Sequence, residues 1–408
     1  MGVIFSTNRR AVAALLDRHP GQNAGVQRRV KAIVDRVRRD GDAAVIAYSS
    51  QFDGLDGPID ISRGEIERAA RSVDGSVRKA IALAARHIRQ VARKQVPPTW
   101  TTRPVAGVAI EQRVLPLDRV GCYVPAGRFP LPSSLLMTAI PARIAGVREV
   151  IAVCPRPDAT VLAAALEAGV TRVLRIGGAH AIAALAYGTP TIPRVDKIVG
   201  PGSAYVAAAK AYVARDCAID FYAGPTEIAV VSASGRAAWI AADLLAQAEH
   251  DPDARAILLT PSRRLANAVV QEMSRLDPRG ALASRGGIIV TASLGEAIAL
   301  CQRFAPEHAV CDDDRVAARL TRAGTVFVGD YSAQASGDYV TGSNHVLPTA
   351  GAAASRGGLS AADFVRVATV QRLTRAGLQR IGPAGARLAD AEGLRFHAAS
   401  IRARLGRS

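Results

Sequence analysis

The feature that most constrains the fold is a regular alternation of short β-branched runs with Ala- and Leu-rich stretches between residues 119 and 330. Most of the runs are followed by a segment whose apolar residues recur every three or four positions, which is typical of a helix. Strand and helix in this order predict parallel sheets that are covered by helices on their faces. The predicted strands are 120–124, 149–154, 172–176, 195–199, 227–232, 256–260, 287–291 and 324–328.

More strands are predicted than one compact sheet needs, and they fall into two similar blocks. We therefore predict an α/β fold with two Rossmann-like doubly wound domains. The first hundred residues have the pattern of successive helices, for example at 26–39 and 76–95. The predicted parts are an N-terminal helical segment (1–20), a first domain (21–118 with 226–358), a second domain (119–225) and a small helical C-terminal tail (359–408, with helices at 360–379, 383–391 and 397–405).

Composition excludes several classes of protein. Hydrophobic residues make up 49% and charged residues 21% of the 408 residues, so disorder, collagen and coiled coil are disfavoured. The formal net charge is +17, but aromatic residues make up only 4% and the arginines are scattered, which disfavours a nucleic-acid partner. No apolar run reaches the roughly 18 residues that cross a bilayer, so no membrane association is expected.

The five cysteines form no CxxC pair, so the sequence predicts neither a disulfide framework nor a thiolate metal site. No signal-peptide core is present at the N-terminus. A reducing compartment suits such cysteines, and we expect the protein in the cytoplasm.

Polar residues with metal-binding side chains gather after residue 246. Gln247 and His250 are three apart at the end of a predicted helix, so both side chains can point at one ion. The alternative is a polar helix end, where His250 faces the negative end of the helix dipole. Glu392 and His397 could face one site only across a break in the helix, which Gly393 provides.

The Gly-rich segment 337–345 contributes Asp338 and His345. Taken with Gln247, His250 and His397, it offers nitrogen and oxygen donors without sulfur. That donor set suits zinc or another borderline ion such as manganese.

Glu307 and His308 follow Pro306 as an adjacent carboxylate and imidazole. Two such groups can serve two different proton transfers, because burial can move the pKa of each toward neutrality. The alternative is a pair of exposed loop residues.

A nucleotide signal is present but weak. Gly200-Pro201-Gly202 follows a predicted strand and precedes a predicted helix, where an anion can bind, but Tyr205 replaces the third glycine of the dinucleotide motif. An ordinary strand-to-helix turn is the alternative. A second Gly/Pro turn lies at 123–128.

Six segments together resemble the histidinol dehydrogenase family, in its order and spacing over nearly the whole chain. They are VGCYVPAG (120–127), GPTE (224–227), QAEH (247–250), APEH (305–308), GDY to NHVLPT (337–349) and EGLRFH (392–397). One match would mean little, but six in register favour the functional interpretation of each motif over its structural alternative.

The resemblance implies an NAD-dependent, zinc-containing homodimer that oxidises the amino alcohol L-histidinol through L-histidinal to L-histidine. The C-terminal tail would cross to the partner subunit, and the zinc ion would anchor the substrate. Carried over by motif, the zinc ligands are Gln247, His250, Asp338 and His397, the acid/base pair is Glu307 and His308, the substrate contacts are Thr226, His345 and Glu392, and the cofactor contacts are Tyr123, His180 and Ser203.

The sequence departs from the family pattern at four positions. His180 stands where Gln is usual, Ser203 where Asn is usual, Ala126 where Gly is usual and Thr226 where Ser is usual. The first two stand at expected dinucleotide contacts, and Arg128 near the cofactor entrance could contact an anionic substrate or a phosphate. Two alternatives therefore remain at this point: a related dehydrogenase of another small alcohol, such as a sulfonated diol, and a non-catalytic basic binding protein.

Overall fold

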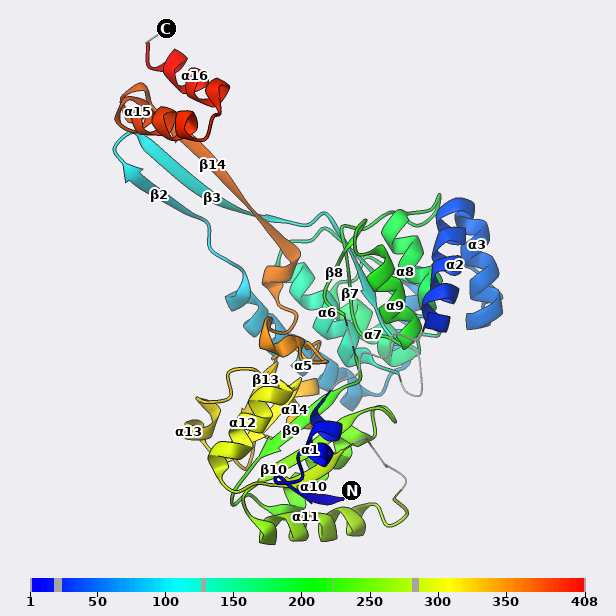
Figure 1. Cartoon of the computed structure of the whole chain (residues 1–408). Helices are drawn as coiled ribbons and strands as arrows, with labels where there is room; N and C mark the ends of the chain where they lie inside the picture. Colours follow the sequence, from blue (N-terminus) through cyan, green and yellow to red (C-terminus); the bar gives the residue numbers. More distant parts are fainter. Residues whose placement is uncertain (1, 18–23, 126–129, 223, 281–285, 407–408) are drawn as a thin grey trace. The chain divides into compact units, whose positions relative to one another are not determined.

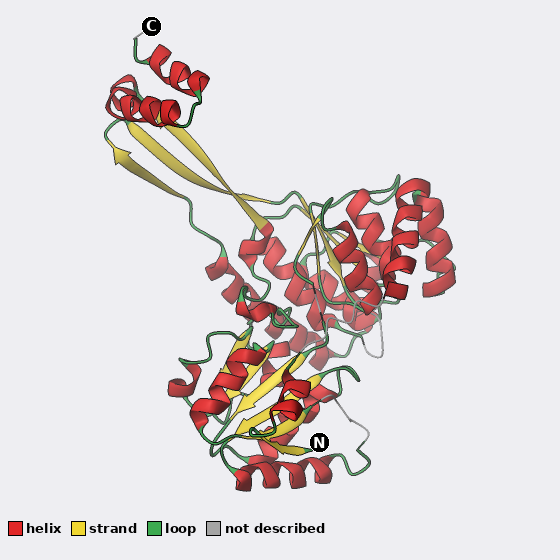
Figure 2. Cartoon of the chain, in the orientation of Figure 1, coloured by secondary structure: helices red, strands yellow, loops and turns green. Residues whose placement is uncertain are grey.

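A computed structural model describes residues 2–17, 24–125, 130–222, 224–280 and 286–406. The described residues divide into two compact units, 1–95 with 118–364 and 96–117 with 365–408. The larger unit contains two parallel sheets with helices on their faces, and the smaller unit contains an antiparallel sheet and two helices (Figures 1 and 2).

The six-stranded sheet has the order β1-β11-β10-β9-β12-β13, and all its neighbours are parallel. From β11 to β13 the strand order is 3-2-1-4-5, so the order reverses at a switch point between β9 and β12. The strands are β1 (Val3–Phe5), β9 (Glu227–Val231), β10 (Arg255–Thr260), β11 (Gly287–Val290), β12 (His308–Cys311) and β13 (Thr325–Val328). Its helices are α1 (Arg9–Leu16), α10 (Ala237–Ala248), α11 (Arg263–Leu276), α12 (Leu294–Phe304), α13 (Asp314–Ala317) and α14 (Gln334–Tyr339).

Two apolar cores cover the two faces of this sheet. On one face Phe304 of α12 and Leu16 of α1 pack against Ala229 and its neighbours. On the other face Leu244 of α10 and Val269 of α11 pack against Ile228 and its neighbours. Successive strand residues point to opposite faces, which explains the unbroken apolar runs that identified these strands in the sequence.

The five-stranded sheet has the order β6-β5-β4-β7-β8 and is also wholly parallel. Its 3-2-1-4-5 order repeats that of the first sheet, with the switch point between β4 and β7. The strands are β4 (Arg119–Tyr123), β5 (Glu149–Val153), β6 (Arg172–Leu174), β7 (Lys197–Val199) and β8 (Ala218–Ile219), and the helices are α6 (Pro132–Ile144), α7 (Ala159–Ala168), α8 (Gly178–Tyr187) and α9 (Ala204–Val213).

The N-terminal helices belong with the five-stranded sheet, which differs from the division predicted from the sequence. Val30, Val34 and Val37 of α2 share one apolar core with Ile182 of α8 and Val206 of α9, while α4 and α5 pack on α7 and α6. From the sequence, residues 21–118 are predicted to share a domain with 226–358. Periodicity locates a helix but does not show which sheet the helix covers. These elements are α2 (Ala24–Asp40), α3 (Asp42–Tyr48), the π-helix η1 (Ser49–Asp53), α4 (Arg63–Ser72) and α5 (Gly75–Gln95).

Two other expectations need correction. The segment predicted as an N-terminal helix (1–20) includes strand β1, which pairs with β11, before helix α1 begins. The segment predicted as the first helix of the tail (360–379) contains a strand, β14 (Val365–Leu373), because its β-branched residues favour a strand that pairs along its whole length with β3.

The smaller unit consists of β2 (Trp100–Val105), β3 (Val108–Pro116), β14, α15 (Arg375–Ala391) and α16 (Arg395–Arg404). Its sheet is antiparallel with β3 at the centre. Two short 3-10 helices, η2 (Ala352–Ala354) and η3 (Ala361–Phe364), precede β14. Throughout the described ranges, every helix is too short or too polar to cross a membrane.

Candidate functional site

Most of the predicted acid/base and metal-binding residues meet at the amino-terminal edge of the six-stranded sheet. Thr226 precedes β9, and Glu307 precedes the neighbouring strand β12, which His308 begins. Helix α10 runs back across the sheet from the carboxyl edge, so its last turn returns Gln247 to the same edge. His250 follows directly after the helix.

Glu307 lies at the centre of a buried hydrogen-bond network. Its Oε2 accepts a bond from the Thr226 hydroxyl and one of 3.0 Å from the backbone N–H of Glu227. The Gln247 amide donates to the same Thr226 hydroxyl. Burial raises the pKa of Glu307, although His308, Thr226 and Glu227 oppose this effect.

His308 is held between a backbone carbonyl and a second carboxylate. Its Nδ1 lies 3.2 Å from the Glu227 carbonyl oxygen, and its Nε2 lies 3.6 Å from Asp338 Oδ1. Burial alone lowers the pKa of His308, but the nearby Glu307 and Asp338 carboxylates outweigh burial and raise it. The Phe327 ring packs beside the imidazole, with the ring centres 6.1 Å apart.

Asp338 links His308 to a second histidine. Its Oδ2 accepts a 2.9 Å hydrogen bond from the Gln334 side chain, and its backbone oxygen lies 2.8 Å from His345 Nδ1. Burial tends to raise the pKa of Asp338, but His308, His345 and His250 lower it overall. Burial lowers the pKa of His345, whose Nε2 lies 3.4 Å from the Ser134 hydroxyl of α6.

One atom of this network is suited to a metal ion. Gln247 is fully buried, its Nε2 is used by Thr226, and its Oε1 has no hydrogen-bond partner within the described residues. A buried carbonyl oxygen without a partner costs free energy unless a cation or donor reaches it. Together with the Asp338 carboxylate and the His250 imidazole, this donor set fits a borderline divalent ion.

Glu392 and His397 belong to the smaller unit. Glu392 is the C-cap residue of α15, Gly393 adopts a left-handed conformation with φ of 75°, and His397 lies in the first turn of α16. Gly393 thus provides the break that was expected between them, and both side chains are exposed. In the described residues no three His, Cys, Asp or Glu side chains are grouped closely enough to hold a metal, and a site that combines Gln247, His250, Asp338 and His397 stays a prediction.

The expected cofactor residues lie at the carboxyl edge of the five-stranded sheet, around its switch point. Tyr123 ends β4, and its hydroxyl accepts a 3.1 Å hydrogen bond from the N–H of Gly178 at the start of α8. Gly200 follows β7 with φ of 112°, and a Cβ there would overlap the Tyr123 carbonyl oxygen. Ser203 is the exposed N-cap residue of α9, and its side chain makes no capping bond.

His180 has a partner that the sequence did not predict. It is buried, and its Nε2 lies 3.0 Å from Asp53 Oδ2, which also accepts the Gly177 N–H. The Tyr48 and Phe52 rings pack beside the imidazole. Ala126 and Arg128 lie outside the described residues.

Sequence reasoning also missed a buried ion pair behind the Gly200 turn. Lys210 and Asp220 contact each other and hold the Gly200 carbonyl oxygen and N–H, at 2.9 Å and 2.8 Å respectively. Lys210 could have been recognised from the sequence, because it is one of only five lysines and lies in an apolar helix. Asp53 carries no such sequence signal, since it contacts His180 in a segment distant in the sequence, and Gln334 bonds Asp338 only four residues later without any motif that marks it.

Comparisons with known proteins agree with the motifs. A family model described as "Histidinol dehydrogenase" matches residues 16–405. The chain is 46% identical to histidinol dehydrogenase of Cereibacter sphaeroides (97% of this chain, 95% of that protein) and 43% identical to that of Aromatoleum aromaticum (96% and 94%). The crystal structure of histidinol dehydrogenase from Elizabethkingia anophelis superimposes with a TM-score of 0.93 at 31% identity, over 99% of this chain and 98% of that one.

Proposed function

The chain belongs to the histidinol dehydrogenase family, and from this premise we propose that it oxidises L-histidinol through L-histidinal to L-histidine with NAD as the hydride acceptor. The observation that carries this proposal is the buried group of Glu307, His308, Asp338 and Gln247 at one sheet edge. Alcohol oxidation needs a base for the hydroxyl proton, and aldehyde oxidation needs an activated water. The non-catalytic alternative has no use for such a group.

We assign the base to His308 and water activation to Glu307. The imidazole accepts the hydroxyl proton in its neutral form, whereas Glu307 and Asp338 favour its charged form. If Asp338 bound a metal ion, its carboxylate would raise the pKa of His308 less. The proposed substrate contacts are Thr226, His345 and Glu392. The first two adjoin this network, and Glu392 lies in a segment that matches a motif of the family.

A metal ion fits the same group of side chains. Gln247, His250 and Asp338, with His397 from the smaller unit, would hold zinc or manganese, and the Gln247 Oε1 atom without a partner supports this assignment. When bound, the ion would orient the substrate as a template.

We assign the acid/base group to the six-stranded sheet and NAD binding to the five-stranded sheet. Both have the strand order of Rossmann-like domains, and in such sheets a dinucleotide binds at the carboxyl edge by the switch point. Tyr123 at the end of β4, His180 in α8 and Ser203 at the start of α9 lie at that edge of the five-stranded sheet, which supports its assignment as the NAD-binding domain. The five cysteines are free and buried, which suits the cytoplasm that we propose.

We also propose a homodimer in which the smaller unit completes the partner's site. This unit exposes large apolar side chains on its sheet and its helical part, among them Val367, Leu373, Leu388, Leu394 and Phe396. Exposed apolar surface of this kind marks an interaction site.

The substrate proposal is tested by offering the protein NAD with L-histidinol or with a sulfonated diol in parallel assays. We expect NADH to form with L-histidinol and to be negligible with the diol. The reverse preference would assign the chain to another small alcohol and would leave the acid/base group in place.

Metal removal is expected to abolish activity, because the buried donors would lose the ion that orients the substrate. Dialysis against a chelator should remove NADH formation, and zinc or manganese should restore it. As a control, a variant with all five cysteines replaced by Ser or Ala should retain its metal, because no cysteine is in the donor set. Elemental analysis that finds no metal in an active preparation would contradict the assignment.

NAD binding is expected to be loose, because His180 is engaged by Asp53 and Ser203 is shorter than the usual amide. The double variant His180→Gln, Ser203→Asn should bind NAD several-fold more tightly in a calorimetric titration. An unchanged affinity would mean that other residues hold the cofactor in this chain.

A further inference from the structure

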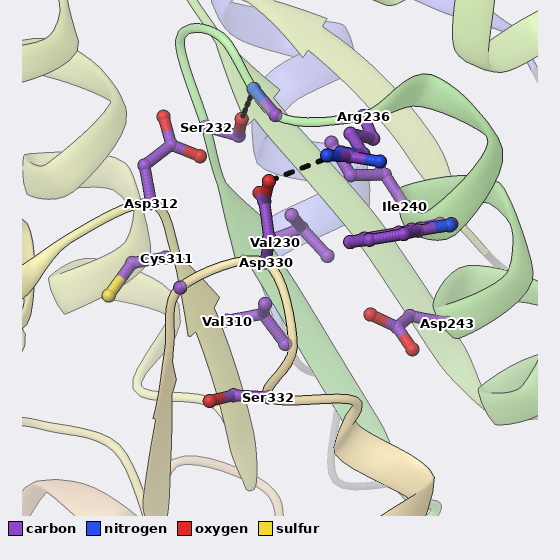
Figure 3. Close-up of a pocket in the computed structure, with 13 residues that line it drawn as sticks. Val230, Ser232, Arg236, Ile240, Asp243, Val310, Cys311, Asp312, Asp330 and Ser332 are labelled. Atoms are coloured by element: carbon purple, nitrogen blue, oxygen red, sulfur yellow. Dashed lines mark hydrogen bonds and ion pairs between the residues drawn. The ribbon is translucent and has the colours of Figure 1, made fainter.

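The six-stranded sheet has a second edge that the proposed reaction does not use. Its catalytic residues lie at the amino-terminal edge, whereas ligands of doubly wound sheets bind at the carboxyl edge beside the switch point. At that place, after β9 and β12, a solvent-open hollow of about 30 Å³ is present (Figure 3). Since one water molecule needs roughly 10 to 15 Å³, the hollow has room for a group the size of an ammonium head, and the body of a ligand would lie outside it on the rim.

The residues around the hollow disfavour the binding of an anion. The loop from β9 to α10 would offer backbone N–H groups to a phosphate, but the Asp312 carboxylate already accepts them. Its Oδ2 lies 2.8 Å from the Ala233 nitrogen and 3.3 Å from the Ser234 nitrogen. Among the lining residues, Asp243, Asp312 and Asp330 are balanced by Arg236 alone, although the chain as a whole carries a charge of +17.

Asp243 is the carboxylate that lacks a cation. Asp330 pairs with Arg236 at 3.3 Å, but no Lys, Arg or His of the described residues forms an ion pair with Asp243. It lies on α10, and its carboxylate points into the hollow opposite Val230 and Val310 (Figure 3). Burial raises the pKa of Asp243 to about 6, against the opposing backbone bond from Gln334, so a nearby positive charge would stabilise its ionised form.

The rim of the hollow is aromatic and already holds a cationic group. The Arg236 guanidinium lies over the Trp239 ring, 4.3 Å from its centre, and the Tyr331 and Trp239 ring centres are 5.5 Å apart. Tyr331 is 89% exposed and lies beside the hollow through its contact with Trp239, which lines it. Aromatic faces of this kind attract organic cations.

From this arrangement we infer that the hollow is a binding site for a small organic ammonium ion, whose charged head contacts Asp243 and whose apolar body packs against Trp239 and Tyr331. The inference is independent of the proposed catalytic function, because it uses none of the catalytic or metal-binding residues.

The test uses benzylamine as the cation, with benzyl alcohol and benzoate as neutral and anionic controls of the same shape. The chain has two tryptophans, so a Trp100→Phe variant leaves Trp239 as the only reporter of fluorescence. We expect benzylamine to change this fluorescence saturably, with a dissociation constant on the order of 1 mM for so small a ligand. Benzyl alcohol and benzoate should bind at least about tenfold more weakly, since neither makes the charge-assisted bond.

The decisive variant is Asp243→Asn, which keeps the shape of the side chain and removes its charge. It should weaken benzylamine binding by about tenfold or more, whereas the surface control Glu272→Gln should not change it. Circular dichroism checks that both variants are folded, and calorimetry of Trp239→Leu should show the same loss without relying on the reporter. Equal binding by Asp243→Asn and the parent, equal binding of benzoate, or no saturable signal would each overturn the inference.

A Glu307→Gln variant separates this site from the catalytic one. Benzylamine binding should be unchanged in Glu307→Gln if the amine occupies the hollow. Loss of binding in Glu307→Gln but not in Asp243→Asn would place the amine at the catalytic edge and would overturn the inference while leaving the proposed reaction intact.

Discussion

Replacing Glu307 with Gln is expected to slow the oxidation of added L-histidinal by about 10² to 10⁴-fold, the usual contribution of a general acid or base. The amide can keep the bond from Thr226 but cannot take a proton from water. Oxidation of the alcohol should fall less, because that step depends on His308. Stopped-flow measurement of NADH with the alcohol or the aldehyde as substrate separates the two steps.

Replacing His308 with Asn should slow both steps, since each needs a proton acceptor beside the reacting carbon. The surface variant Glu67→Gln is a control for the loss of a carboxylate, because Glu67 pairs with Arg63 on α4 and should leave both rates unchanged. Losses below about tenfold in both catalytic variants would show that Glu307 and His308 are bystanders.

The second large effect concerns assembly. His250→Ala and His397→Ala should each be inactive alone, because each removes a proposed metal ligand. Unfolded and refolded as an equal mixture, the two variants should recover about a quarter of the parent activity. Random pairing makes about half of the dimers mixed, and each mixed dimer has one site with both defects and one site with neither.

This recovery depends on exchange of the smaller unit between subunits. If the unit served the site of its own chain, every site would keep one defect and no activity would return. A mixture of His250→Ala with Gln247→Ala is the matched control, because both changes lie in the larger unit. Recovery in that control would contradict the proposed composite site.

The two parallel sheets could be predicted from the sequence because their strands are buried on both faces. Most of the predicted strands contain an uninterrupted apolar run, as in 150–153 and 228–231. All eight predicted strands are present, whereas β1, β8 and β12 of the same sheets were not predicted. The antiparallel sheet of the smaller unit was missed because its strands are mostly exposed. In β14, Arg366 and Arg372 lie among β-branched residues, and its pairing with β3 is a contact between segments some 250 residues apart.

Individual site residues could be predicted where a motif marks them, but their environment could not. Taken alone, the sequence around Glu307 and His308 is typical of an exposed loop, yet both residues are buried at the start of β12. Asp338, which contacts His308, lies in a helix thirty residues further along the chain. The bond between His180 and Asp53 joins two segments whose proximity depends on the packing of η1 against α8. Such contacts are fixed by tertiary structure, and a single sequence carries no record of them.

The central claim is that one site carries out both oxidations, and the ratio of products tests it most directly. NADH and L-histidine are measured in the same reaction, started with L-histidinol and excess NAD and sampled at several times. The account predicts two NADH for every L-histidine, without accumulation of free aldehyde. One NADH per turnover with the aldehyde as the final product, or no NADH at all, would contradict it.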